Sequence, residues 1–295
     1  MICVIFNPTA RGDKAKTFRA RLAQLQGVEF RPTTGPGTAP MLAAAAVEDG
    51  ATTVVAAGGD GTVNEVLNGV ASLPGGFARA RLAVLPLGTV NVFAKELRIP
   101  TDFTQAWRVI QVGHERIIDL PHADPVTPGE TGRRYFAQMA GAGIDSRALS
   151  LVNWELKKRA GALAYVWASM KALRGPRPQV TVDAAGQKVT GQLVLIGNGR
   201  FYGGRYPVFP AARLDDGRLD VTVFPRVNWF TITRVFLSLQ GNRLARSPDA
   251  ICFQSESLTL SARDGTPWHV EGDNAGPLPR RFSIRPRALR VVVPG

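Results

Sequence analysis

Residues 54–65 read VVAAGGDGTVNE, a pattern that predicts a strand, a tight turn and a helix. The first four residues are uncharged and favour β-structure, as in a buried parallel strand. From Val63 onward, apolar residues recur at the spacing of one helix face, so the glycines fall at the strand-to-helix turn. Backbone amides at a helix N-terminus attract anions, and residues without Cβ let an anion approach closely. The stretch therefore predicts an α/β fold with a phosphate site at this turn.

Asp60 lies among these glycines, where its carboxylate would repel a phosphate unless a cation lay between them. Divalent cations that bridge carboxylate and phosphate oxygens resolve this conflict, so Asp60 is interpreted as a ligand of Mg²⁺ or of its water. The alternative is an ordinary tight turn in which Asp60 caps the following helix. The Walker consensus G-x-x-x-x-G-K-[ST] does not occur in the sequence.

The charge of the chain is strongly positive, with 36 Lys and Arg against 23 Asp and Glu and a formal net charge of +13. Residues 1–120 contain 12 basic and 10 acidic side chains, whereas residues 121–295 contain 24 and 13, a net charge of +11. This excess favours an anionic partner such as a membrane surface or a phosphorylated substrate. No recognised nucleic-acid motif accompanies it, so nucleic acid is not an expected partner.

Cysteine usage and the first residues bear on the cellular compartment. Cys3 and Cys252 lie in separate apolar runs, which predicts two buried, reduced thiols. Met1 opens directly into a strand-like segment instead of a basic region followed by an apolar one, so no export signal is expected. Because no apolar run has the length of a membrane-spanning helix, membrane contact is expected to be peripheral. These observations favour a cytoplasmic protein.

The predicted secondary structure changes near residue 120. Strand-like runs alternate with amphipathic helices before it, and short strands dominate after it, which predicts an α/β domain over 1–120 and a β-rich domain over 121–295. A polar loop over 122–133 is expected between them. A helix over 148–173 carries a basic and aromatic cluster, either a solvated face or a membrane contact. Whether the last strand, about 286–295, returns to the first domain is left open.

Polar residues follow several strands of the predicted parallel sheet. Asn7 and Arg11 come directly after the first strand, and Thr34 ends the second. In open α/β sheets ligands bind at the carboxyl ends of the strands, so these residues are candidates for a nucleotide site. A second glycine turn at residues 86–94 reads PLGTVNVFA. Two such turns at this spacing are a more specific signal for phosphate binding than one.

The two turns resemble the signatures of diacylglycerol kinases, sphingosine kinases, NAD kinases and phosphofructokinases, which bind ATP at a GGDGT turn. The opening strand followed by Asn7-Pro8 resembles the first motif of the bacterial lipid kinases within this group. The resemblance implies a parallel-sheet domain like that of NAD kinase and phosphofructokinase. It also implies ATP binding by Asn7, Arg11, Thr34, Gly58, Gly59, Gly61, Thr62, Glu65, Gly88, Thr89 and Asn91.

A third motif lies in the second half of the chain. Residues 210–220 read PAARLDDGRLD and are similar to the P-x-A-x-x-x-D-G-x-L-D motif of bacterial lipid kinases. In that family the Asp-Gly turn holds a divalent ion away from the phosphates. The resemblance implies that Asp216 and the carbonyl oxygens of Arg213 and Arg218 bind Mg²⁺, which prefers such oxygen ligands.

A fourth motif bears on catalysis. Residues 271–273 read EGD, where the resembled kinases have D-G-E and use the Asp as general base toward a lipid hydroxyl. The resemblance implies the base role for Glu271 and a supporting role for Asp273, in addition to Asp60 at the phosphates. One extra methylene can displace a carboxylate by about 1 Å, a distance that matters in catalysis. An ordinary surface turn is the alternative for these residues.

Two further positions depart from the family pattern: Val92 replaces a frequent acid, and Gln138 replaces an Asn. The resemblance nevertheless covers residues 2–294. It predicts an ATP- and Mg²⁺-dependent lipid kinase that phosphorylates a lipid hydroxyl, with a diacylglycerol-type lipid favoured. A soluble kinase similar to NAD kinase and a non-catalytic nucleotide- or lipid-binding regulator are the alternatives. The expected partners are the lipid, an anionic membrane surface and, as a candidate only, a second copy of the chain in a homodimer.

Overall fold

The structure is a computed structural model of the 295-residue chain. It describes residues 1–8, 14–127, 129–146, 177–204, 206–240, 244, 247–263 and 265–295. Arg11 and the helix expected over 148–173 lie outside the described residues.

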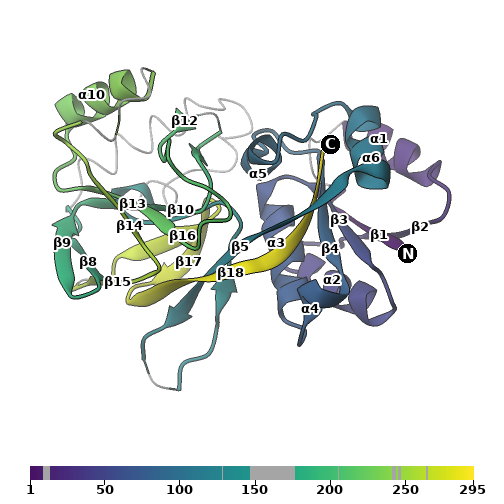
Figure 1. Ribbon diagram of the computed structural model, residues 1–295, viewed down its shortest axis with the longest axis horizontal. Coiled ribbons are helices and arrows are strands. Elements are labelled where there is room, and N and C mark those ends of the chain that lie inside the picture. Colours follow the sequence, from purple (N-terminus) through teal and green to yellow (C-terminus); the bar gives the residue numbers. More distant parts are fainter. Residues whose placement is uncertain are drawn as a thin grey trace.

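The N-terminal half alternates strands and helices, as the sequence predicts. Its parallel strands are arranged in the order β2-β1-β3-β4, and helices surround them (Figure 1). All six residues of β3 are buried, because a strand inside a covered parallel sheet has no face toward water. The elements are β1 (Ile2–Phe6), α1 (Lys14–Ala23), β2 (Val28–Pro32), α2 (Ala39–Glu48), β3 (Thr53–Gly58), α3 (Asp60–Ala71), α4 (Gly76–Arg79), β4 (Arg81–Pro86), α5 (Val92–Glu96) and α6 (Phe103–Val112).

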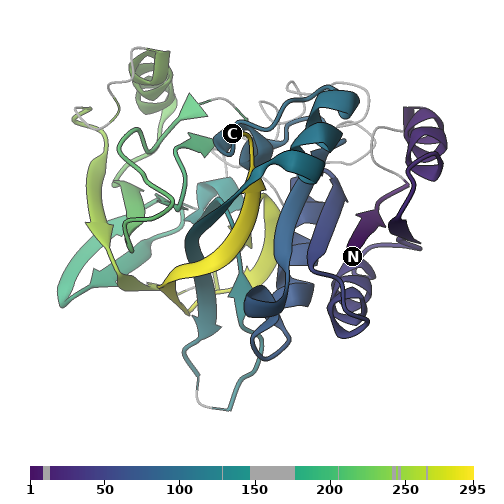
Figure 2. The ribbon, with the colours of Figure 1, turned by 45° about the vertical axis from the view of Figure 1, so that its right-hand side comes forward.

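Two long strands connect the halves. β5 (His114–Pro125) pairs antiparallel with β18 (Arg280–Val293) over most of its length, and β18 also pairs in parallel with β4 through Val291 and Leu82. The C-terminal strand thus returns to the first sheet (Figures 1 and 2). The loop expected over 122–133 is wrong at its start, because pairing with β18 extends β5 to Pro125 despite the local composition.

The C-terminal half is a β-sandwich, which confirms the expected β-rich domain. An antiparallel sheet in the order β14-β13-β10-β7-β16-β17 packs against the part of the first sheet that contains β18, β15 and β8. The rings of Trp268 and Phe282 meet edge to face between the two sheets, with centroids 5.5 Å apart. The elements are β6 (Arg134–Tyr135), β7 (Met139–Gly143), β8 (Val180–Ala184), β9 (Gln187–Gly191), β10 (Leu193–Gly197), β11 (Phe201–Tyr202), β12 (Tyr206–Pro207), β13 (Leu219–Phe224), α10 (Trp229–Gln240), β14 (Ile251–Ser255), β15 (Ser257–Ala262), β16 (Pro267–Val270) and β17 (Asp273–Pro277).

The two cysteines have different environments. Cys3 is buried in β1, whereas Cys252 is exposed on β14, which forms the edge of the second sheet. The prediction of two buried thiols is therefore wrong for Cys252, because an apolar run on an edge strand is covered by neighbouring strands on one side only. Among the described residues, no helix is long and apolar enough to cross a membrane.

Candidate active site

The two glycine turns lie directly against each other at the carboxyl ends of β3 and β4. The amides of Leu87 and Gly88 both donate to the carbonyl oxygen of Gly58, at 2.9 and 3.1 Å. A Cβ on Gly88 would lie 2.5 Å from the Cα of Gly59, and a Cβ on Gly58 would lie 2.4 Å from Thr62 Oγ1. Both distances are too short for packed atoms, so glycine is required at position 88 by the main chain of Gly59 and at position 58 by the side chain of Thr62.

Asn91 closes the second turn with its own side chain. It adopts the left-handed conformation, with φ 53°, and precedes the first residue of α5. Its Oδ1 accepts from the amide of Gly88 at 3.0 Å and its Nδ2 donates to the Gly88 carbonyl at 2.8 Å. Thr89, between them, is exposed. The buried amide of Asn91 therefore shapes the turn, and Thr89 is the side chain that faces outward.

Other residues expected at the nucleotide site hold α3 in place. Asn7 Nδ2 donates to the hydroxyl of Thr62 at 3.2 Å and so connects the end of β1 with α3. Glu65 Oε1 accepts from the amide of Gly37 at 3.1 Å, which ties α3 to the loop after β2. Thr34, on the same loop, is exposed. These bonds join three strand ends around the N-terminus of α3.

Asp60 connects the two turns through a carboxylate. It is the first residue of α3, and its Oδ1 accepts from the amide of Phe93 at 3.2 Å, at the start of α5. Burial raises its pKa, and the backbone amides of residues 91–93 and the charge of Lys95 oppose that rise. The carboxylate thus lies where the positive ends of two helices meet.

Glu271 approaches from the C-terminal half on the hairpin between β16 and β17. Glu271 and Gly272 have φ of 51° and 85°, the two left-handed residues of a type I′ turn, in which Asn or Asp is usual at the first position. Glu271 Oε1 accepts from the amides of Ala137 at 2.8 Å and Gln138 at 2.7 Å. Burial, followed by the negative charge of Asp60, raises the pKa of Glu271 to about 8. Two acids from opposite halves of the molecule therefore influence each other.

Asp273 belongs to the same hairpin. It begins β17, is exposed, and its Oδ2 lies 3.3 Å from the position that a Cβ on Gly61 would take. Its carboxylate therefore lies over the first turn of α3. Within the described residues, no three His, Cys, Asp or Glu side chains could hold a metal by themselves. A cation beside Asp60 would need phosphate or backbone oxygens to complete its ligands.

The Asp-Gly turn of the third motif contains a pair of acids. Asp216 Oδ1 accepts from the amide of Arg218 at 3.0 Å. Burial, with the nearby charge of Asp216, raises the pKa of Asp220 to about 6. Repulsion between two carboxylates favours a bound cation, so the donor chemistry of the turn fits a divalent ion.

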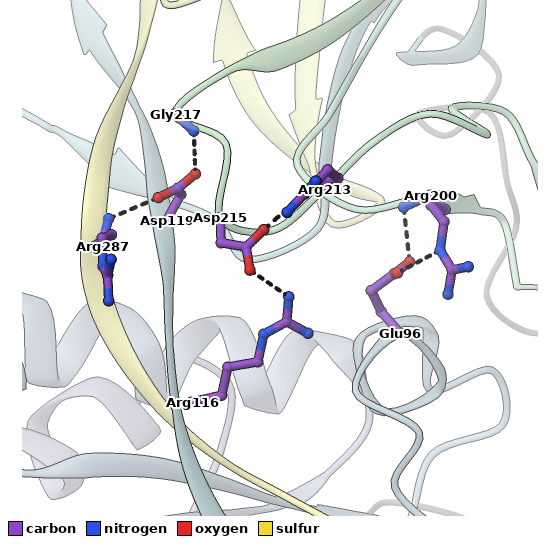
Figure 3. Close-up of polar contacts among 8 residues, drawn as sticks. All are labelled: Glu96, Arg116, Asp119, Arg200, Arg213, Asp215, Gly217 and Arg287. Atoms are coloured by element: carbon purple, nitrogen blue, oxygen red, sulfur yellow. Dashed lines mark hydrogen bonds and ion pairs between the residues drawn. The ribbon is translucent and has the colours of Figure 1, made fainter.

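Asp119 holds this turn against the central strands. Its carboxylate is fully buried and accepts from two amides at 2.7 Å, that of Gly217 in the turn and that of Arg287 in β18 (Figure 3). The amide of Asp119 donates to the carbonyl of Leu214 at 2.7 Å. Such bonds satisfy an otherwise costly buried charge. Asp119 thereby fixes the Asp-Gly turn to β5 and β18.

Sequence reasoning missed Glu96 on α5. Its buried carboxylate accepts from Arg200 Nε at 2.9 Å, from the amides of Arg200 at 2.8 Å and Phe201 at 3.3 Å, and from Gln138 Nε2 at 3.3 Å. The backbone amide of Gln138 donates to Glu271. Glu96, which holds the side chain of Gln138, therefore supports the segment that positions Glu271. Glu96 is the only acid in residues 92–99, which read VFAKELRI, and no motif there indicated its role.

A second cluster, whose contacts the sequence did not predict, lies in the sandwich. The fully buried His269 places its Nε2 2.9 Å from Asp145 Oδ2 and 3.0 Å from the hydroxyl of Tyr202, and Tyr202 donates to Asp145. Burial acts to raise the pKa of Asp145, but the bonds from His269 and Tyr202 prevail and lower it. The cluster fastens the loop of β11 to β16, two residues before Glu271.

Comparison with known proteins relates both halves to described domains. Residues 1–123 match the diacylglycerol kinase catalytic domain, and residues 138–293 match the YegS C-terminal NAD kinase beta sandwich-like domain. Diacylglycerol kinases of Staphylococcus carnosus and Staphylococcus aureus are each 28% identical to this chain over 303 and 299 residues. The alignments cover 99% of this chain and 94% and 91% of those proteins.

A solved structure gives the same result for the fold. The crystal structure of a diacylglycerol kinase from Bacillus anthracis has a TM-score of 0.74 at 23% identity, and the match covers 99% of this chain and 96% of that one. At this identity the likeness is evidence for the fold alone.

Proposed function

Because this chain belongs to the family that carries the diacylglycerol kinase catalytic domain, we propose that it is an ATP- and Mg²⁺-dependent kinase of a diacylglycerol-type lipid. The observation that carries the proposal is that the hairpin of Glu271 and Asp273 lies over the first glycine turn, where Asp273 Oδ2 is 3.3 Å from the position of a Cβ on Gly61 and the charge of Asp60 acts on Glu271. Phosphoryl transfer depends on positioning and charge neutralisation more than on covalent chemistry. A site of two facing halves, each rigidly held, suits that requirement.

The glycine turns would bind the triphosphate of ATP. The N-termini of α3 and α5 direct backbone amides and partial positive charge to one place. Gly59 and Gly61 leave the main chain uncovered there, while Asn7 and Asn91 hold its shape. Asp60 would hold Mg²⁺, which neutralises charge on the phosphates when bound.

Glu271 would act as the general base. Its two amide bonds fix the direction of the carboxylate, and a pKa of about 8 lies near the pH at which a base is most effective. The proton of the lipid hydroxyl passes to Glu271 as the lipid oxygen bonds to the γ-phosphorus. The bond between that phosphorus and the bridging oxygen breaks, and ADP leaves. Asp273 would support the acceptor side of the site.

A second Mg²⁺ would be bound by Asp216 with the carbonyl oxygens of Arg213 and Arg218. The repulsion between Asp216 and Asp220 supports this assignment, and Asp119 holds the turn in place. The role of such an ion is structural: it would fix the loop before β13 against β5.

A kinase of a membrane lipid must reach the membrane, and we propose that helix α10 contacts the membrane surface. Trp229, Phe230 and Leu237 on this helix are 52%, 78% and 64% exposed, and α10 lies at the outer edge of the C-terminal half (Figure 1). Aromatic and aliphatic side chains on a positively charged protein favour binding at an anionic interface. We therefore propose peripheral, cytoplasmic membrane association for the chain.

The test is a transfer assay with labelled ATP and Mg²⁺. Dispersed diacylglycerol, a sphingoid base, phosphatidylglycerol and soluble NAD are offered in separate reactions. We expect labelled phosphatidic acid from diacylglycerol and its loss in Asp60→Asn. Asp102→Asn is the matched control, because Asp102 is likewise an aspartate at a helix N-terminus, where its carboxylate accepts from the amide of Gln105 in α6. Label in NAD alone would favour a NAD kinase, and no labelled product would favour a non-catalytic regulator.

A further inference from the structure

A cavity of about 550 Å³ lies at the C-terminal end of α5, whereas the glycine turns lie at its N-terminal end. Four arginines from separate segments line it together with two acids, and Figure 3 shows most of them. The charged lining residues are Arg98, Arg116, Arg200, Arg213, Glu96 and Asp215. The lining side chains carry four positive and two negative charges, and the last residue, Gly295, lines the cavity as well.

Glu96 and Asp215 engage only some of the guanidinium N–H donors that line the cavity. Glu96 pairs with Arg200 at 2.9 Å, and Asp215 pairs with Arg116 at 2.9 Å and Arg213 at 3.4 Å. The three arginine side chains are still 38–71% exposed, and each guanidinium carries five N–H donors. Among the described residues, no carboxylate forms an ion pair with Arg98.

Arg98 also has an unusual backbone. Its φ is 58°, and it follows the C-cap Leu97 of α5, a position that glycine usually occupies. An L-residue with a side chain pays a conformational cost there. Residues in such sparsely populated backbone conformations cluster at active sites and ligand sites.

We propose that this cavity binds a phosphate group carried by a small organic substituent, about the size of glycerol or a sugar. Guanidinium groups match phosphate oxygens with paired hydrogen bonds, and here they reach one space from both halves of the molecule. The volume is in the range of sites for small ligands. The glycine turns and Glu271 do not line this cavity, so its ligand is additional to the reactants of the proposed kinase.

Glu96 connects this cavity with the candidate active site. The same carboxylate that pairs with Arg200 also accepts from Gln138 Nε2, and the amide of Gln138 donates to Glu271. The cavity and the hairpin that carries Glu271 are therefore connected through the hydrogen bonds of Glu96 and Gln138.

Calorimetric titration of the full chain with glycerol 3-phosphate and with inorganic phosphate tests the proposal. ADP is present in excess to fill the glycine turns. Arg98→Gly removes one guanidinium while relieving the positive φ, so the variant folds. Arg287→Gly is the matched control, since Arg287 is an exposed arginine with φ 49° that does not line the cavity. Both variants lose one positive charge.

We expect Arg98→Gly to weaken binding of glycerol 3-phosphate up to about fivefold, with an unfolding temperature no lower than that of the wild type. We expect Arg287→Gly to keep wild-type affinity. Equal affinity in Arg98→Gly, equal weakening in both variants, or no saturable binding in the wild type would overturn the proposal. Failure of ADP to bind would count against the kinase function, but the contrast between the variants would still decide this site.

Binding to vesicles shows whether the phosphate group belongs to a lipid headgroup or to a soluble compound. Phosphatidylcholine vesicles with and without phosphatidic acid are sedimented with the wild type and both variants. A lipid headgroup in the cavity predicts that Arg98→Gly lowers binding to the acidic vesicles more than Arg287→Gly does. A soluble phosphomonoester predicts equal vesicle binding by the two variants, together with the calorimetric difference. Each result supports the cavity and assigns the origin of its ligand.

Discussion

The glycine turns and the hairpin that carries Glu271 face each other, yet they are built in opposite ways. At the turns, main chain packs against main chain so closely that a Cβ on Gly88 would reach 2.5 Å from Gly59. At the hairpin, a bulky acid occupies a left-handed position and its carboxylate is held by two amides of a neighbouring segment. The first region has no room for a side chain at Gly88, whereas the second accommodates a strained acid whose burial raises its pKa.

The largest expected effect comes from removing the acid at the hairpin. Glu271→Gln keeps the size of the side chain and removes its ability to accept a proton, so kcat should fall by about 10²–10⁴-fold. The variant should be at least as stable as the wild type, because a neutral side chain suits the site and, unlike Glu271, does not lose stability as the pH rises. Kinase assays and thermal unfolding of the same sample measure both quantities. Full activity in the variant would show that Glu271 is not the base.

The turns should respond in the opposite way. Gly88→Ala forces the backbone of two turns apart, so we expect it to lower the free energy of unfolding by about 1–3 kcal/mol and to weaken ADP binding. Gly35→Ala is the control, because Gly35 has a negative φ and its Cβ would meet nothing within 4 Å. Denaturant unfolding and calorimetry compare the pair. Equal stability of the two variants would contradict the packing argument.

The glycine turns were predictable from the sequence, whereas the contacts that side chains make around them were not. The strand before Gly58 and the helix after it were predicted well, because apolar periodicity and missing Cβ atoms are local signals. Asn91 was expected at a ligand, and the structure adds that it holds its own turn, a role that was not predicted because side-chain contacts to backbone are not visible in a motif. The binding roles of these residues stay predictions.

Long-range contacts account for most of what was missed. Glu96 meets Arg200, more than a hundred positions away, and His269 meets Asp145 and Tyr202 from two other segments. The extension of β5 to Pro125 likewise depends on pairing with the distant strand β18. A local sequence pattern cannot predict such contacts, because the partners are far apart in the sequence and only the folded chain brings them together.

A smaller effect concerns pH. The raised pKa keeps Glu271 protonated in the folded protein up to about pH 8, whereas its ordinary value is 4.5. Its contribution to stability is therefore complete below about pH 4.5 and is lost as the pH rises through 8. Between pH 6.5 and 8.5, above the pKa of about 6 at Asp220, the free energy of unfolding should fall by about 1 kcal/mol.

Glu271→Gln is the control for the pH effect, because an amide does not titrate. Denaturant unfolding at several pH values should show a flatter dependence in the variant than in the wild type. An identical slope in the two proteins would assign the pH dependence to other groups and would place the Glu271 carboxylate in a more solvated position.

The smallest effect should come from exchanging the two acids to Asp-Gly-Glu, the order in the motif that residues 271–273 resemble. In Glu271→Asp alone, the shorter side chain fits the first position of a type I′ turn better but withdraws from the amides of Ala137 and Gln138. Asp273→Glu extends the reach of the second acid over Gly61. The double variant should therefore keep kcat within about threefold of the wild type, while Glu271→Asp alone loses about tenfold. Steady-state kinetics of the three proteins decides this, and a double variant as impaired as the single one would mean that the two acids act independently.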